Sequence, residues 1–191
     1  QLKTLVNALG AHLVVKPVRQ GSALGVTRVS DQQALTEAVA LAFNYDDQLL
    51  IEQRIIGREM TVGILEHPGR TDAFPVIEII TPENSWYDFH HRYTQGASDH
   101  IMPAEITPAL TAQLQAAAIT AHQCLGCRDL SRADFIVMAD NTFVLLEVNT
   151  LPGMTPTSLY PDGARGQGYA FDELLVHLIE RACVRGTSSR H

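Results

Sequence analysis

Hydrophobic positions along the chain follow two periods, and these predict an alternation of helices and strands. Apolar residues spaced three and four apart predict amphipathic helices, whereas short apolar runs bounded by turn residues predict strands. The predicted helices are 2–9, 31–43, 107–126 and 171–184, and the predicted strands are 12–18, 26–30, 48–55, 59–66, 73–80, 132–139 and 142–149. Because strands and helices alternate but several strands follow one another across short turns, we expect an α/β protein with antiparallel or mixed sheets.

Local residues predict one helix start and two long loops. Ser30 with Gln33 three residues later is typical of a capping box, so we expect Ser30 to cap the helix 31–43. The polar segments 81–100 and 151–163 are predicted as loops. Loops of this length inside a compact domain are usually functional or disordered.

The strongest candidate site lies in the sequence RADFIVMADNTFVLLEVN. If residues 140–141 form the tip of a two-residue hairpin loop, or the middle of a four-residue one, Asp134 lies opposite Glu147. In the same register Arg132 lies opposite Asn149, and all four side chains share one face because strand side chains alternate. Opposed carboxylates repel one another unless a cation joins them. Carboxylate and amide oxygens are ligands typical of magnesium, although an Arg–Asp pair on a solvated face remains an alternative.

A second candidate site surrounds Lys16, which lies in the apolar run LVVKPV. An unpaired ammonium would be costly there, and a phosphate would pair it. The glycine-bearing segment RQGSALG follows directly and could present backbone N–H groups to phosphates. The alternative is a lysine that extends from a strand edge to solvent. Glu52 and Glu59, on either side of an extended segment, could hold an adenine amino group and a ribose, although each could equally be a surface carboxylate.

The sequence NTLPGMTPTSLYP is a third candidate. Pro152 and Gly153 turn the chain, and the hydroxyls of Thr155, Thr157 and Ser158 follow beside backbone N–H groups. This arrangement suits a small carboxylate ligand. The alternative is a capped turn whose hydroxyls are satisfied internally.

Composition narrows the classes of partner. The net charge is −7 without a basic patch, so we expect no nucleic acid partner. No apolar run approaches the roughly 20 residues that span a bilayer, so no membrane association is expected. Three cysteines suit a reducing cytoplasm, and Cys124 with Cys127 supplies only two of about four zinc ligands. A metal-binding structural protein is therefore a distant alternative, and the absence of an initial Met suggests a piece of a longer chain.

Taken together, the sequence resembles the ATP-grasp superfamily and, within it, the D-alanine–D-alanine ligases. The matching segments are VVKPVRQGSALGV, IEQRIIGREMTV, WYDFHHRYTQG, SRADFIV and LLEVNTLPGMTPTSLYP, which span nearly the whole chain. The last segment is the most specific. The resemblance implies an ATP-grasp fold with ATP between two α+β lobes, in which 1–57 is part of the central subdomain and 58–191 the C-terminal domain.

The resemblance also implies roles for individual residues, with ATP and Mg²⁺ (or Mn²⁺) as cofactors. The nucleotide would be bound by Lys16, Glu52, Gln53, Ile55 and Glu59, and the metal by Asp134, Glu147 and Asn149. Arg132 would stabilise the transferring phosphoryl group, while Tyr93 would bond Ser22 and close the loop over the site. The second substrate would be received by Gly153, Ser158, Leu159 and Arg92.

The implied activity is ligation of two D-alanines through a D-alanyl phosphate, for peptidoglycan precursors in a bacterial cytoplasm. A homodimer is expected at full length, and inactivity for these 191 residues alone. The sequence departs from the family pattern at Gln20, Ala23 and Arg92, and His90 and His91 are unusual. Because a His in this loop resembles D-lactate ligases, D-lactate or D-serine as second substrate remains an alternative. A nucleotide-binding module without catalysis is another.

Overall fold

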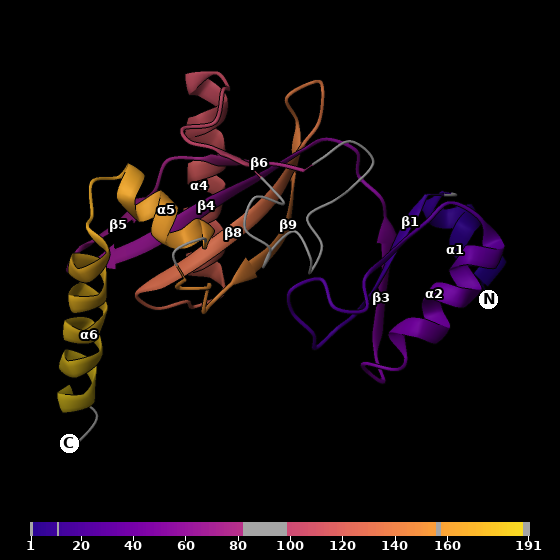
Figure 1. The fold of residues 1–191 in the computed structure, drawn as a ribbon, viewed down its shortest axis with the longest axis horizontal. Helices are drawn as coiled ribbons and strands as arrows, with labels where there is room; N and C mark the ends of the chain where they lie inside the picture. The colour runs from indigo at the N-terminus through magenta and orange to yellow at the C-terminus, as the bar shows by residue number, and fades with distance from the viewer. Residues whose placement is uncertain (1, 11, 82–98, 156–157, 189–191) are drawn as a thin grey trace. The chain divides into compact units, whose positions relative to one another are not determined.

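The computed structural model describes residues 2–10, 12–81, 99–155 and 158–188 (Figure 1). Within it the chain divides into two compact units. Unit 1 contains Gln1–Ile56, and unit 2 contains Gly57–Ile80 together with Asp99–His191. Each unit has its own sheet and its own hydrophobic core.

In its described residues, unit 1 is a three-stranded sheet with two helices. Its elements are α1 (Leu2–Leu9), β1 (Leu13–Pro17), β2 (Thr27–Val29), α2 (Gln32–Ala42) and β3 (Leu49–Gln53). The strand order is β2-β1-β3, and both pairings are antiparallel. Leu13 and Val15 of β1 are buried in a cluster with Leu35 of α2. Because strand side chains alternate, Lys16 lies on the opposite face of this sheet from that cluster.

The start of α2 differs from the prediction by one residue. The N-cap is Asp31, whose carboxylate accepts a hydrogen bond from the backbone N–H of Ala34 at 2.8 Å. The predicted capping box on Ser30 is therefore wrong. Both Ser and Asp are good N-caps, and the Ser-x-x-Gln pattern did not distinguish them.

Unit 2 is built on a larger sheet with three helices. Its strands are β4 (Arg58–His67), β5 (Arg70–Ala73), β6 (Ile77–Ile80), β7 (Asp99–Ile101), β8 (Leu130–Val137) and β9 (Phe143–Asn149). Its helices are α4 (Pro108–Cys124), α5 (Leu159–Gly166) and α6 (Phe171–Ser188). The strand order is β7-β6-β4-β8-β9, with β5 also paired to β4, and each described pairing is antiparallel. The predicted antiparallel or mixed sheets are confirmed.

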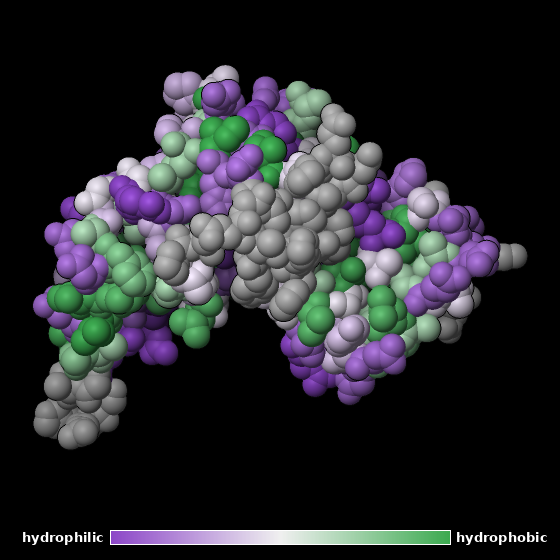
Figure 2. Space-filling view, viewed as in Figure 1, coloured by the Kyte–Doolittle hydropathy of each residue, from purple (hydrophilic) through white to green (hydrophobic). Residues whose placement is uncertain are grey.

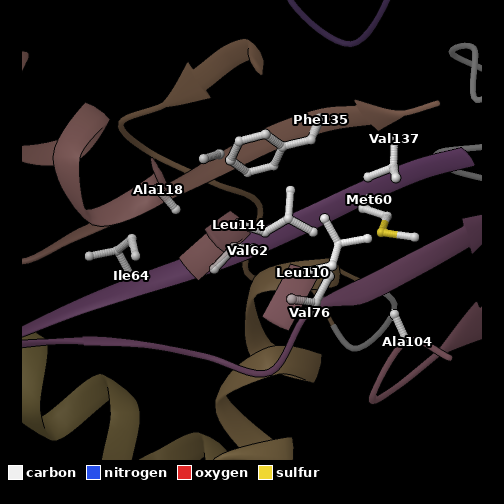
Figure 3. Close-up of a cluster of buried hydrophobic side chains, with 11 residues drawn as sticks. Met60, Val62, Ile64, Val76, Ala104, Leu110, Leu114, Ala118, Phe135 and Val137 are labelled. Carbon is white, nitrogen blue, oxygen red and sulfur yellow. The ribbon is translucent and has the colours of Figure 1, made fainter. Parts of the chain in front are cut away.

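The side chains of the long strand β4 alternate between the two faces of this sheet. Met60, Val62 and Ile64 point to one face, where α4 packs through Leu110 and Leu114 (Figure 3). The β8 side chains on this face complete the cluster, and they are Ala133, Phe135 and Val137. A fully buried apolar side chain of this size contributes about 1.5–3 kcal/mol, so this cluster is the main support of the sheet.

The other face of β4 carries a second core at one end. Gly63 lies where an added Cβ would come within 2.5 Å of Phe74 and 3.1 Å of Tyr160. Tyr160 of α5 is fully buried, stacks at an angle on Phe74 and donates its hydroxyl to the carbonyl of Ile64 at 2.9 Å. Only glycine permits this close approach, which brings α5 onto the sheet.

Three predicted boundaries in unit 2 are wrong. The strand expected over 73–80 is two strands, β5 and β6, separated at Phe74–Val76, because Pro75 cannot donate to a strand ladder. The loop expected over 151–163 contains the first residues of α5. Pro161 and Gly163 in this segment are typical of turns, so the sequence did not indicate a helix here. Residues 99 and 100 of the other expected loop belong to β7.

The surface is mixed, with polar and apolar side chains interspersed (Figure 2). Apolar side chains gather over α6, where Val176, Ile179 and Val184 are exposed. Across the described ranges, no helix combines the length and the apolar character needed to cross a membrane.

Candidate functional site

The β8–β9 hairpin places four of the predicted site residues together. Arg132 pairs with Asn149 and Asp134 with Glu147, which confirms the predicted register at this end. The tip is different, because Met138 donates to the carbonyl of Thr142 at 2.8 Å across a three-residue loop. A register shift between Asp134 and Phe135 corrects the one-residue difference. The predicted two- or four-residue loop is therefore wrong, and a β-bulge restores the pairing at the site.

Asp134 is the centre of a dense set of hydrogen bonds. Arg132 donates from Nε to its Oδ1 at 2.8 Å and from Nη2 to its Oδ2 at 2.7 Å. Asn149 donates from Nδ2 to Oδ2 at 3.1 Å, and the same nitrogen lies 3.4 Å from Glu147 Oε1. We call Arg132, Asp134, Glu147 and Asn149 the metal face. Arg132 and Asp134, which form an ion pair within the metal face, are mostly buried. Their side chains are 8% and 13% exposed.

The structure adds a residue that the sequence analysis missed. Thr61 of β4 pairs with Asp134 of β8, and its Oγ1 lies 2.6 Å from Asp134 Oδ1. Glu59, predicted to bind ribose, lies two residues earlier on β4 and therefore on the same face as Thr61. The signal was present as the alternation Glu59-x-Thr61, but it could be used only once β4 was known to pair with β8.

The chemistry of the metal face fits a hard divalent cation. Asp134, Glu147 and Asn149 supply two carboxylates and one amide, and magnesium usually takes one or two carboxylates with phosphate and water oxygens completing its shell. Among the residues that the structure describes, no three His, Cys, Asp or Glu side chains gather as a metal site. Cys124 and Cys127 are both free thiols.

In unit 1, Lys16 and Glu52 contact each other. Lys16 pairs with Leu50 and Val14 with Glu52, so Lys16 and Glu52 are diagonal neighbours on adjacent strands. The ammonium of Lys16 lies 2.6 Å from Glu52 Oε1, with side chains 22% and 36% exposed. The residues predicted to bind the phosphates and the adenine are thus joined by an ion pair.

The glycine-bearing loop after β1 has an unusual backbone. Ser22 and Ala23 have positive φ angles of 53° and 58°, which is the left-handed region that L-residues rarely adopt. The start of the loop is held by Asp46, which accepts from the backbone N–H of Arg19 at 2.6 Å. Hydrogen bonds from Arg19 and Gln48 lower the pKa of Asp46 to about 2, although desolvation opposes this. Conformations of this kind are common where backbone N–H groups face an anion.

The remaining adenine candidates lie at the end of β3. Gln53 is its last residue and is exposed, and Ile55 follows it, half-buried. Between them, the backbone N–H of Arg54 donates to the carbonyl of His12 at 2.9 Å.

The turn predicted to receive the second substrate packs against the start of α5. Ser158 is the N-cap residue of α5, and its Oγ accepts from the backbone N–H of Thr155 at 3.0 Å. An added Cβ on Gly153 would lie 2.8 Å from that Oγ, so Gly153 permits the turn to close. Leu159 is buried beneath it. Because the side chain of Ser158 does not cap the helix, the first backbone N–H groups of α5 are candidates to bind a carboxylate.

A polar contact fastens α5 to β7. His100 Nδ1 lies 2.9 Å from Asp162 Oδ2, and Arg165 pairs with the other oxygen of Asp162. Burial lowers the pKa of His100, and the charge of Asp99 opposes this effect. Neutral His100 can serve as the hydrogen-bond donor to Asp162.

Arg92 and Tyr93, predicted for substrate and lid roles, lie outside the described residues, as do His90 and His91.

Comparison with known proteins agrees with this geometry. The family model described as the D-ala D-ala ligase C-terminus matches residues 1–180. A D-alanine–D-alanine ligase from Halalkalibacterium halodurans is 48% identical over 168 residues, which cover 87% of this chain and 55% of the relative. One from Bordetella petrii is 40% identical over 184 residues, covering 96% and 56%. The chain thus spans about half the length of these relatives.

Solved structures give the same result. The VanG D-Ala:D-Ser ligase from Enterococcus faecalis superimposes with a TM-score of 0.80 at 34% identity, covering 93% of this chain and 52% of that one. The D-alanine–D-alanine ligase from Coxiella burnetii gives 0.79 at 30%, covering 99% and 50%. The fold is therefore that of the ATP-grasp ligases, and the chain belongs to the D-Ala–D-Ala ligase family, of which it matches the C-terminal region.

Proposed function

We propose that this chain is the ATP-, metal- and second-substrate-binding region of an enzyme that ligates two D-alanines. The observation that carries the proposal is the metal face, where two strands bring a guanidinium, two carboxylates and an amide onto one side of a sheet. In the reaction, ATP phosphorylates the carboxylate of the first D-alanine. The amine of the second D-alanine then attacks the acyl phosphate, and inorganic phosphate leaves.

The chain's own residues would do three kinds of work in this reaction. Asp134, Glu147 and Asn149 would hold Mg²⁺, which when bound neutralises charge on the phosphates. Arg132 would stabilise the phosphoryl group in transfer, because a planar guanidinium matches its oxygens. When ATP binds, the ammonium of Lys16 would leave the carboxylate of Glu52 and pair with a phosphate of ATP, since both the carboxylate and the phosphate are anions.

The second substrate would be bound by the turn before α5. The first backbone N–H groups of the helix would donate hydrogen bonds to its carboxylate, while Gly153 and Ser158 set the shape of the turn. D-serine as second substrate is the other candidate, and the observation that favours it is the 34% identity to a D-Ala:D-Ser ligase, against 30% to the D-alanine–D-alanine ligase from Coxiella burnetii. Product partition from equimolar D-alanine and D-serine separates the two, and we expect the D-alanyl-D-alanine product to dominate.

The proposal is tested by Glu147→Gln in a ligase of full family length. We expect a loss of turnover on the order of a thousandfold, because a metal-held charge is worth several kcal/mol in the transition state. The fold should survive, since the change also relieves repulsion between Glu147 and Asp134. The control is Glu180→Gln on the exposed side of α6, with phosphate release measured at saturating Mg²⁺. Unchanged turnover in Glu147→Gln would contradict the proposal.

For the 191 residues alone we propose weak, magnesium-dependent nucleotide binding and no detectable dipeptide. Ligation requires both amino acids in reacting geometry, and loss of that positioning forfeits about 7–11 kcal/mol. Calorimetric titration with an ATP analogue, beside an assay for dipeptide, tests both parts. Robust dipeptide synthesis would show that the first substrate also binds within this chain.

We also propose that the full-length ligase acts in the cytoplasm as a homodimer. Three free thiols support a reducing compartment. Sedimentation of the full-length ligase would test the dimer, and a monomer at micromolar concentration would contradict it.

A further inference from the structure

Thr61 is a buried polar residue that the proposed reaction leaves without a role. It lies in the middle of β4, the central strand of unit 2, and its side chain is 1% exposed. Its Oγ1 lies 2.6 Å from Asp134 Oδ1 and 3.2 Å from the backbone carbonyl of Ala133. A threonine hydroxyl has one proton, and the shorter contact is to a charged acceptor, so the proton belongs between Thr61 and Asp134.

The donors around Asp134 differ in how freely they can move. Arg132 has a long side chain, and Asn149 lies on β9, which among the described strands pairs with β8 alone. Thr61 has a short β-branched side chain on a strand paired on both sides, which restricts its rotamer. A cation that binds Asp134 competes with all three donors. Arg132 and Asn149 have more rotatable bonds by which to turn from the carboxylate than the β-branched side chain of Thr61 has.

The two oxygens of Asp134 therefore have different surroundings. Oδ1 accepts from Thr61 and from Nε of Arg132, while Oδ2 accepts from Nη2 of Arg132 and from Asn149. The nitrogen of Asn149 also lies within 3.4 Å of Glu147 Oε1, so Oδ2 is the oxygen on the side of Glu147. Fixing Oδ1 would orient Oδ2 toward the second carboxylate.

We propose that Thr61 is a positioning residue that holds Oδ1 of Asp134, so that Oδ2 faces the divalent cation together with Glu147. This inference rests on the proposed function, because it assigns the metal face its cation. Hydrogen bonds behind a metal ligand typically change metal affinity by about 10–100-fold when removed. Thr61 requires no contact with the substrate or the cation to have this effect.

The test is Thr61→Val in a ligase of full family length, because valine keeps the size and branching of threonine without its hydroxyl. Mn²⁺ is the probe, and its binding in the presence of ADP is followed by electron paramagnetic resonance. We expect the dissociation constant for Mn²⁺ to rise about 10–100-fold. Thr61→Ser, which retains the hydroxyl, should restore binding close to that of the wild type. Thr120→Val is the matched control, because its hydroxyl donates to the carbonyl of Ala116 in α4 at 2.8 Å, away from the metal face.

Three outcomes would overturn part of the assignment. If Thr61→Val lowers the thermal midpoint but binds Mn²⁺ like the wild type, the hydroxyl bonds only the Ala133 carbonyl and the inference fails. If Thr61→Ser binds as poorly as Thr61→Val, the methyl group rather than the hydroxyl is responsible. If the wild type itself binds no Mn²⁺, the proposed metal face fails. Should Thr61→Val not fold, Thr61→Cys, a weak donor of similar size, must show the same rise.

Discussion

Asp134 of unit 2 and Lys16 of unit 1 both lie on paired strands, yet their surroundings differ. Asp134 accepts hydrogen bonds from three side chains, one on its own strand β8 and one on each of the neighbouring strands β4 and β9. Lys16 has one described ion pair, to Glu52 on the adjacent strand. The side chain of Asp134 is 13% exposed and that of Lys16 is 22% exposed.

The difference indicates two ways of preparing a charged group for a ligand. The geometry of Asp134 is held from several directions, so a small change in one neighbour should be felt strongly. Glu52, the described partner of Lys16, is partly exposed, so water or a phosphate can replace it at little cost. Fixed geometry suits a metal ligand. A cation whose partner can be exchanged suits a residue that binds the flexible phosphate chain of a nucleotide.

Arg132→Lys tests the fixed side of the comparison and has the largest expected effect. Lysine keeps the charge but cannot make the two parallel hydrogen bonds to Asp134. We expect turnover in the full-length ligase to fall about 10²–10³-fold, as for loss of one transition-state donor. Phosphate release measures it, with the exposed Arg128→Lys as control. Near wild-type turnover would remove the distinction between the two units.

Lys16→Arg is the corresponding exchange in unit 1 and should be milder. Because Glu52, the described partner of Lys16, is partly exposed, the new cation can find a similar position. We expect the KM for ATP to rise by no more than about tenfold, which corresponds to about 1.4 kcal/mol. A loss as large as that of Arg132→Lys would show that Lys16 is held as strictly as the metal face.

The histidines of unit 2 predict a smaller effect, of acid on stability. Burial lowers the pKa of His67, with repulsion from His177 as a second cause, and burial likewise lowers the pKa of His100. The unfolded chain, with an ordinary histidine pKa of 6.5, therefore binds more protons than the folded one. Stability contributed by these groups is present above that pH and is lost as the pH falls below it.

Urea denaturation between about pH 7.5 and 5 should therefore show a falling midpoint, before most carboxylates titrate. Histidine ring signals in NMR, followed over the same range, should place the titration of His67 and His100 below pH 6.5. A midpoint that rises on acidification would reverse the assigned sign.

Glu52→Gln should have the smallest effect. Removing a partly exposed ion pair is expected to lower the free energy of unfolding of unit 1 by at most about 1 kcal/mol. Hydrogen exchange of the β1 and β3 amides measures it, with Glu37→Gln on the exposed side of α2 as control. A loss of several kcal/mol would show that the Lys16–Glu52 pair is a structural support.

Much of the architecture could be predicted from local patterns. The apolar runs located β1, β4, β8 and β9, because buried strands in this chain are short and bounded by turns. The pairing of Asp134 with Glu147 was predicted from an assumed loop of two or four residues. It is correct because the bulge offsets the three-residue loop that the structure has. The roles assigned to these residues remain predictions.

Other features depend on contacts that a linear pattern does not contain. The helix α5 begins at Leu159 despite Pro161 and Gly163, because Tyr160 is anchored by Phe74 and the Ile64 carbonyl. Thr61 could be recognised as a neighbour of Asp134 only once β4 was known to pair with β8. The choice of Asp31 over Ser30 as N-cap was a matter of one residue, which capping patterns seldom resolve.

The bulge in β9 has a consequence for how this hairpin tolerates changes in length. Phe143 packs on the α4 side with Phe135, and regular alternation from Phe143 would send Glu147 and Asn149 to that same side. The extra residue at Leu146 reverses the alternation, so that the same odd-numbered positions supply the core at one end and the metal face at the other. Losing Leu146 would leave every described pair of the hairpin in place. Deleting Val148, two positions after Leu146, would instead turn Asn149 toward the core and so remove a proposed metal ligand.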